Sequence, residues 1–118
     1  MHPVADQIAG LDEPARSLLA RLYARAVDLV PTAIEGHSYG MPALLHRDRP
    51  LVALAVTAKG YSIYPFSGQV IASLDAQLGE LPRSKGTVSF TDAHPIPRAA
   101  FDALVLARRA EIDAALDG

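Results

Sequence analysis

The sequence contains no cysteine, and this absence excludes several kinds of chemistry at once. Without thiols the chain has no disulfide scaffold, no thiolate zinc site, no iron–sulfur ligation and no cysteine nucleophile. Neither sign of charge predominates, because 13 acidic residues against 11 basic ones leave a formal net charge of only −2. The arginines are scattered among acidic residues rather than gathered in a stripe that could follow phosphates, so we expect no nucleic-acid partner.

Long hydrophobic runs are missing as well. No apolar stretch approaches the ~20 residues that are needed to cross a bilayer. The opening MHPVADQIAG lacks the basic start and the continuous apolar run of a secretory signal. We therefore expect no membrane partner and a cytoplasmic location. The 118 residues have the size of one domain, residues 1–118, which buries roughly two-thirds of its unfolded surface without a metal or a disulfide.

Apolar residues recur at helical spacing in three parts of the chain. The first predicted helix follows Asp12, the expected N-cap, and ends at Pro31. A short helix is expected to begin after Ser67 and to stop at Gly79. A third helix opens near Pro97 and continues to within a few residues of the C-terminus.

Between the first two helices the apolar pattern becomes that of strands. Residues 34–64 contain four short runs rich in Val, Leu, Ile and Tyr, which are separated by Gly-Met-Pro, Asp-Arg-Pro and Lys-Gly and predict an antiparallel meander. A brief fifth strand is expected within residues 84–90. The order helix, four strands, helix, strand, helix predicts an α+β fold of two layers, in which a mostly antiparallel sheet packs against the helices.

The third run of the meander has two different faces. Its even positions, from Val52 to Val56, carry large side chains, whereas its odd positions, from Ala53 to Thr57, carry small ones. One face should meet the helices. The small-residue face is then covered by another element, used in a dimer, or left as a shallow groove flanked by tyrosines.

Four short motifs resemble the YdhG-like family of small bacterial domains, whose function is unknown. They are YGMPA at residues 39–43, IYP at 63–65, SKGT at 84–87 and PIP at 95–97, and their order spans nearly the whole chain. The resemblance implies an α+β fold. The family is linked by resemblance to frataxin-type iron chaperones, which implies iron as the one metal to consider; we expect no other cofactor.

An iron chaperone of this type is expected to hold iron weakly on an exposed acidic ridge, because hard cations prefer carboxylate oxygens. Here Asp12, Glu13 and Asp28 are interleaved with arginines along the same predicted helix. The resemblance therefore supports the fold more strongly than it supports the iron function.

The candidate metal ligands are Glu35, His37 and His46. A turn over residues 40–43 would set His37 opposite His46, with Cβ atoms ~5 Å apart. A turn over residues 40–42 would point the two histidines to opposite faces of the sheet. Both versions leave the ligand shell incomplete, so surface or cross-strand histidines are the simpler interpretation.

No catalytic set can be assembled from the sequence. His37 and Ser38 are neighbours, but adjacent residues on a strand point to opposite faces, so these two cannot act as base and nucleophile. We therefore expect that the protein is not an enzyme.

The preferred interpretation is a non-enzymatic binding or chaperone-like domain for an unknown small molecule or protein. Its ligand site is expected on the small-residue face and is bounded by Tyr39, Met41, Tyr61, Lys85 and Arg108. Two alternatives stay open. One is a weak iron chaperone that uses the three candidate metal ligands, and the other is an interaction module that forms a homodimer through this face or through an edge strand.

Overall fold

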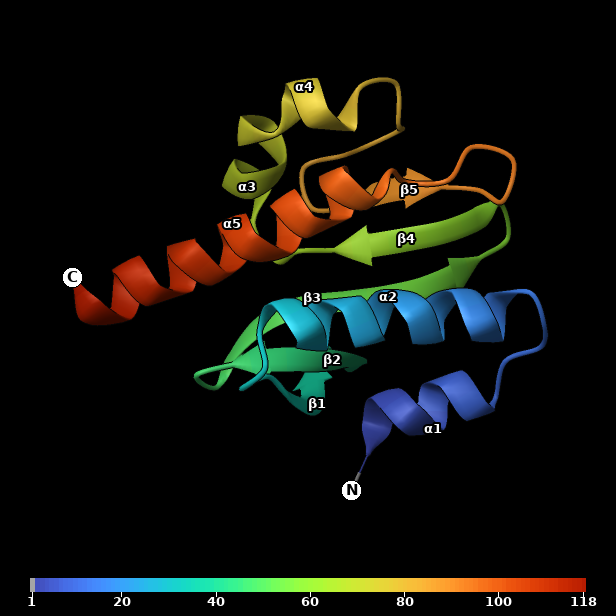
Figure 1. Cartoon of the computed structure of the whole chain (residues 1–118), viewed down its shortest axis with the longest axis horizontal. Helices are drawn as coiled ribbons and strands as arrows, with labels where there is room; N and C mark the ends of the chain where they lie inside the picture. Colours follow the sequence, from blue (N-terminus) through green and yellow to red (C-terminus); the bar gives the residue numbers. More distant parts are fainter. Residues whose placement is uncertain (1) are drawn as a thin grey trace.

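Five antiparallel strands form one sheet in chain order, and helices cover it (Figure 1). The computed structural model describes residues 2–118. The α+β class and the meander are as predicted. The elements are α1 (Pro3–Ala9), α2 (Ala15–Leu29), β1 (Ile34–Ser38), β2 (Met41–His46), β3 (Arg49–Thr57), β4 (Gly60–Tyr64), α3 (Gly68–Ser73), α4 (Asp75–Leu78), β5 (Val88–Phe90) and α5 (Arg98–Asp117).

Helices α2 and α5 contact each other and lie across the same face of the sheet (Figure 1). Leu19 of α2 and Phe101 and Leu104 of α5 are fully buried there, which confirms the apolar stripes predicted for both helices. Helix α1 packs on β1 and β2, whereas α3 and α4 pack on α5. No helix in residues 2–118 combines the length and the apolar character needed to span a membrane.

The helix boundaries differ from the prediction in three places. Helix α1 was not predicted. Helix α2 begins at Ala15, and Asp12 does not cap it; the Glu13 carboxylate instead accepts from the Ser17 amide at 3.0 Å and from the Ser17 hydroxyl at 2.8 Å. The single helix expected from Ser67 to Gly79 is divided into α3 and α4, which meet at Leu74.

The turn between β1 and β2 is shorter than either version we considered. It consists of Tyr39 and Gly40 alone, with φ values of 52° and 74°, which is the left-handed pair of a type I′ turn. His37 therefore lies opposite Pro42. It does not lie opposite His46, as a turn over residues 40–43 would require, and the register of a turn over residues 40–42 is not formed either. Type I′ turns fit the right-handed twist of the strands. This preference outweighs the tendency of the proline two residues later to be part of a longer turn.

Strand β2 separates from β3 after a register shift at Leu44 and Leu45. As a result the backbone of Leu54, further along β3, pairs with side chains rather than with β2. The Leu54 amide donates to the Tyr23 hydroxyl at 2.9 Å, and the Leu54 carbonyl accepts from the Gln7 amide group at 2.8 Å. Burial raises the pKa of Tyr23 to about 12, so this hydroxyl stays protonated and donates in turn to Gln7.

Candidate functional site

A groove of about 1270 Å³ runs along the start of β4 and the edge strand β5, and we call it the β5 groove. It is lined by residues within three segments, which are 57–62 around the β3–β4 turn, 77–82 at the end of α4, and 89–97 around β5. Small-molecule sites usually enclose ~300–1,000 Å³, so this larger and open cleft suits an extended ligand.

The outer wall of the β5 groove, residues 79–82, is held in place by Arg83. The guanidinium of Arg83 donates to the Asp75 carboxylate at 2.6 and 3.1 Å, and to the carbonyls of Gly79 at 2.9 Å and Leu81 at 2.8 Å. One side chain therefore satisfies two loop carbonyls and links them to α4.

The inner wall of the β5 groove is aromatic. Tyr61 and Phe90 lie directly opposite each other on β4 and β5, and their rings stack with centroids 5.1 Å apart. The Tyr61 hydroxyl donates to Asp92 at 2.9 Å. Burial, followed by the neighbouring Asp92 carboxylate, raises the pKa of Tyr61, so the phenol remains a neutral donor.

Hydroxyl groups and three ionisable side chains complete the lining. Ser62 and Ser89 face each other across β4 and β5, and both border the groove. Lys59, Glu80 and His94 are exposed at its margin. One cation and one anion leave no dominant charge, so the β5 groove is suited to a largely apolar ligand with a few hydrogen-bonding groups.

The residues predicted to bound the ligand site do not surround one cavity. Only Tyr61 lines the β5 groove. The groove also does not lie above Ala53, which is fully buried, so the small-residue face is covered in its centre rather than open. Tyr39 lies at the β1–β2 turn, where the residue is 88% exposed and its ring stacks on Phe66 with centroids 6.0 Å apart. Met41 begins β2 beside this turn and is half-buried.

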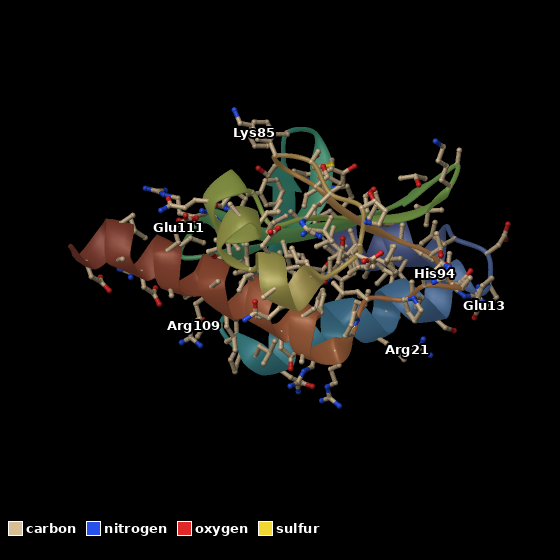
Figure 2. All side chains as sticks on the ribbon, turned by 90° about the horizontal axis from the view of Figure 1, so that it is seen from above. Glu13, Arg21, Lys85, His94, Arg109 and Glu111 are labelled. Atoms are coloured by element: carbon tan, nitrogen blue, oxygen red, sulfur yellow. The ribbon has the colours of Figure 1, made fainter. Side chains whose placement is uncertain are left out.

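Lys85 and Arg108 lie near the start of α3, away from Tyr61. The carbonyl oxygen of Lys85 comes so close to Gly68 that a Cβ there would be 2.7 Å from it. Figure 2 shows the Lys85 side chain at the outer margin of the molecule, on the side opposite Arg21. Arg108 is largely buried, donates to the Pro50 carbonyl at 2.9 Å, and pairs with Glu111 at 2.6 Å. Its guanidinium therefore joins α5 to β3 and is not free for a ligand.

The three candidate metal ligands lie apart. The Glu35 carboxylate accepts from the Ala5 amide at 2.9 Å, and His37 is exposed on β1. His46 is buried, and its Nε2 lies 2.8 Å from the Asp113 carboxylate. Within residues 2–118 no group of three or more histidine, aspartate or glutamate side chains could hold a metal ion. The metal set considered from the sequence is not assembled.

Sequence reasoning missed most of the β5 groove. Arg83, Asp92 and Leu81 were not singled out, because their roles depend on partners that are distant along the chain or on the path of a loop. Two signals were present in the sequence. Gly79 is a predicted helix stop, and Pro95 belongs to one of the four family motifs. Two of the residues that line the groove therefore lie in segments that the sequence already marks.

Comparison with known proteins supports the fold. No family model matches the chain, and no curated protein matches it either. A solved structure does: the crystal structure, at 1.75 Å, of a YdhG protein of the DUF1801 family from Bacillus subtilis superposes with a TM-score of 0.82. The match covers 95% of this chain and 91% of that chain at 11% sequence identity. The chain therefore has the fold of a YdhG-type domain, as the motifs implied.

Proposed function

We propose that the chain is a non-enzymatic binding domain that holds an extended, largely apolar ligand in the β5 groove. The observation that carries this proposal is the groove itself, about 1270 Å³ in volume, with an aromatic wall and opposed serines. The proposed setting is the cytoplasm. The unknown function of the YdhG-like family neither adds a reaction nor contradicts binding.

The hydroxyl groups of the β5 groove support binding rather than catalysis. A serine or threonine nucleophile needs a base within hydrogen-bond reach. In the part of the chain that the structure describes, no serine or threonine hydroxyl is hydrogen-bonded to a histidine ring. At Thr91 the hydroxyl accepts from the His94 backbone amide, so it stabilises the loop.

Leu81→Glu is the direct test of the β5 groove. We expect the neutral fluorophore N-phenyl-1-naphthylamine to bind the native chain, with increased and blue-shifted emission. Leu81 is half-buried, and a carboxylate at this point of the wall should weaken binding at least about tenfold, because an ionised group opposes contact with an apolar ligand. Leu106→Glu is the matched control, since Leu106 is exposed on α5 and does not border the groove.

A second variant separates loss of the site from loss of the fold. Gln77 is exposed and borders the groove, so Gln77→Trp should obstruct it without disturbing the core. Thermal melts followed by circular dichroism show whether each variant is folded. The proposal is wrong if the native chain does not bind the probe, or if both folded groove variants bind it as tightly as Leu106→Glu does.

A second candidate function is self-association through β1. This strand lies at the edge of the sheet opposite β5, so within residues 2–118 its outer side pairs with no other strand. Ile34 on β1 is 55% exposed, and Val27 of α2 is 38% exposed; both border a hollow of about 560 Å³ between α1, α2 and β1. An open edge beside exposed apolar side chains is the arrangement through which a second copy of a chain can pair.

For self-association we expect sedimentation equilibrium to give twice the chain mass at micromolar concentration. Ile34→Lys should return the mass to that of the monomer, because a lysine on an edge strand opposes pairing. Leu106→Lys serves as the control, since it places the same charge on an exposed apolar position of α5. A monomeric native chain at every concentration tested would rule this candidate out.

A further inference from the structure

A second hollow, of about 470 Å³, lies between α2 and the start of α5, and we call it the arginine hollow. It shares Phe90 and Pro95 with the β5 groove, so these two residues separate the two cavities. No residue predicted from the sequence to bind a ligand borders it. Its lining is unusual because a chain with a net charge of −2 places three arginines around it, Arg21, Arg25 and Arg98.

Only one of the three arginines forms an ion pair with a carboxylate. Arg25 binds Asp102 with two hydrogen bonds, from Nε at 2.9 Å and from a terminal nitrogen at 2.7 Å. This pair lowers the pKa of Asp102, with a smaller contribution from the charge of Arg98. Among residues 2–118 neither Arg21 nor Arg98 forms an ion pair. Asp28 is the only acidic residue that borders the hollow itself.

The two unpaired arginines come from different elements. Arg21 and Arg25 are one helical turn apart on α2, and Arg98 begins α5 on the other side of the hollow. Figure 2 shows Arg21 projecting from α2 on the same side of the molecule as the segment that carries His94. Guanidinium groups present planar pairs of donors that match an anionic oxygen pair, so two of them bordering one hollow favour an anionic group there.

The remainder of the arginine hollow is apolar. Leu18 and Leu22 of α2, together with Ile96 and Phe101, form its base. A bare inorganic anion would leave this apolar surface in water, whereas an uncharged apolar molecule would leave both arginines without a partner. The lining thus matches a molecule with an apolar body and one anionic end.

We propose that the arginine hollow binds an amphiphilic anion, with the anionic end held by Arg21 and Arg98 and the apolar body on Leu18, Leu22 and Ile96. Arg25 is a positioning residue, because its pairing with Asp102 joins α2 to α5 and fixes the width of the hollow. The proposal is independent of the β5 groove, since the two cavities use different polar groups.

Decanoate is a suitable probe, and isothermal titration calorimetry is the measurement. We expect decanoate to bind the native chain and to bind at least about tenfold more weakly when both arginines are changed, as Arg21→Gln with Arg98→Gln. Both positions are exposed, so the double variant should fold, and its melting curve checks this. Arg49→Gln with Lys85→Gln is the matched control, because it also removes two positive charges, from exposed residues outside the hollow.

Two further ligands test the two halves of the proposal. Decanamide, which has the same chain without the charge, should bind at least about tenfold more weakly than decanoate, and so should inorganic phosphate, which has charge without the chain. Leu81→Glu should leave decanoate binding unchanged, which distinguishes this site from the β5 groove. The proposal is overturned if decanoate does not bind, if the folded Arg21→Gln/Arg98→Gln variant binds it as tightly as the Arg49→Gln/Lys85→Gln control, or if decanamide or phosphate binds as tightly as decanoate.

Discussion

Changing Tyr23 to phenylalanine is expected to lower the free energy of unfolding by about 2 kcal/mol, although only one oxygen atom is lost. The buried Leu54 amide donates to that oxygen at 2.9 Å, and strand β2 has already turned away, so no backbone carbonyl of β2 replaces it. A buried amide left without a partner costs roughly 1–3 kcal/mol. Chemical denaturation of the two proteins measures the difference.

Tyr64→Phe is the control for this prediction, because it makes the same change on β4 at a half-buried residue whose hydroxyl forms no hydrogen bond to residues 2–118. We expect its effect to be below about 0.5 kcal/mol, as is usual for changes away from buried networks. If Tyr23→Phe is as mild as Tyr64→Phe, the side chain is not the partner that stabilises the Leu54 amide.

Gly60→Ala is expected to be the more damaging change, with a loss of about 2–4 kcal/mol. The φ of Gly60 is 148°, a region that other residues rarely adopt, and strain of this kind costs roughly 1–3 kcal/mol. A Cβ at this position would also lie 2.5 Å from the Phe90 carbonyl oxygen and 3.0 Å from the side chain of Thr91. The backbone of β4 and β5 must then shift.

The effect of Gly60→Ala should extend to ligand binding. Phe90 and Thr91 border the β5 groove, so their displacement should weaken binding of N-phenyl-1-naphthylamine as well as stability. Gly86→Ala is the matched control, because no atom lies within 4 Å of a Cβ built there. Denaturation and probe titration of both variants check the prediction, and an alanine at 60 that is tolerated like one at 86 would contradict it.

The sequence predicted the long elements better than the short ones. The period of apolar residues located α2 and α5, and turn residues located the meander, because packing of a whole face determines both. Helix α1 escaped notice for a physical reason: isolated helices shorter than ~12 residues are marginal, so contacts decide whether they form. Here the contacts are the bonds from the Ala5 amide to Glu35 and from Gln7 to Leu54.

The register of the first hairpin could not be obtained from the sequence. Asn-Gly and Asp-Gly are the usual signals for a type I′ turn, and Tyr39-Gly40 is neither. The stacking of Tyr39 on Phe66, which lies far along the chain, accompanies the turn. Since the position of His37 depends on that register, whether it lies opposite His46 could be determined only from the structure.

The candidate site was predicted in part. Tyr61 belongs to the predicted set, but its other four residues lie elsewhere, because the small-residue face is covered at Ala53 and no groove forms there. The groove lies at the start of β4 instead, where residues 79–82 provide a wall. That wall depends on which groups Arg83 contacts, and no local pattern of residue types specifies those contacts.

The attachment of this wall through its backbone carbonyls separates the shape of the loop from the identity of its residues. Because Arg83 holds the carbonyl groups of Gly79 and Leu81, and the Ser89 amide donates to the Pro82 carbonyl at 2.8 Å, the path of the loop depends little on the side chain of Glu80. Glu80 borders the groove, as does the exposed Gln77 of α4. These two positions can therefore vary while the backbone keeps its course. Selectivity for a different ligand is accessible by mutation there at little cost in stability, so the domain provides a scaffold for engineered recognition.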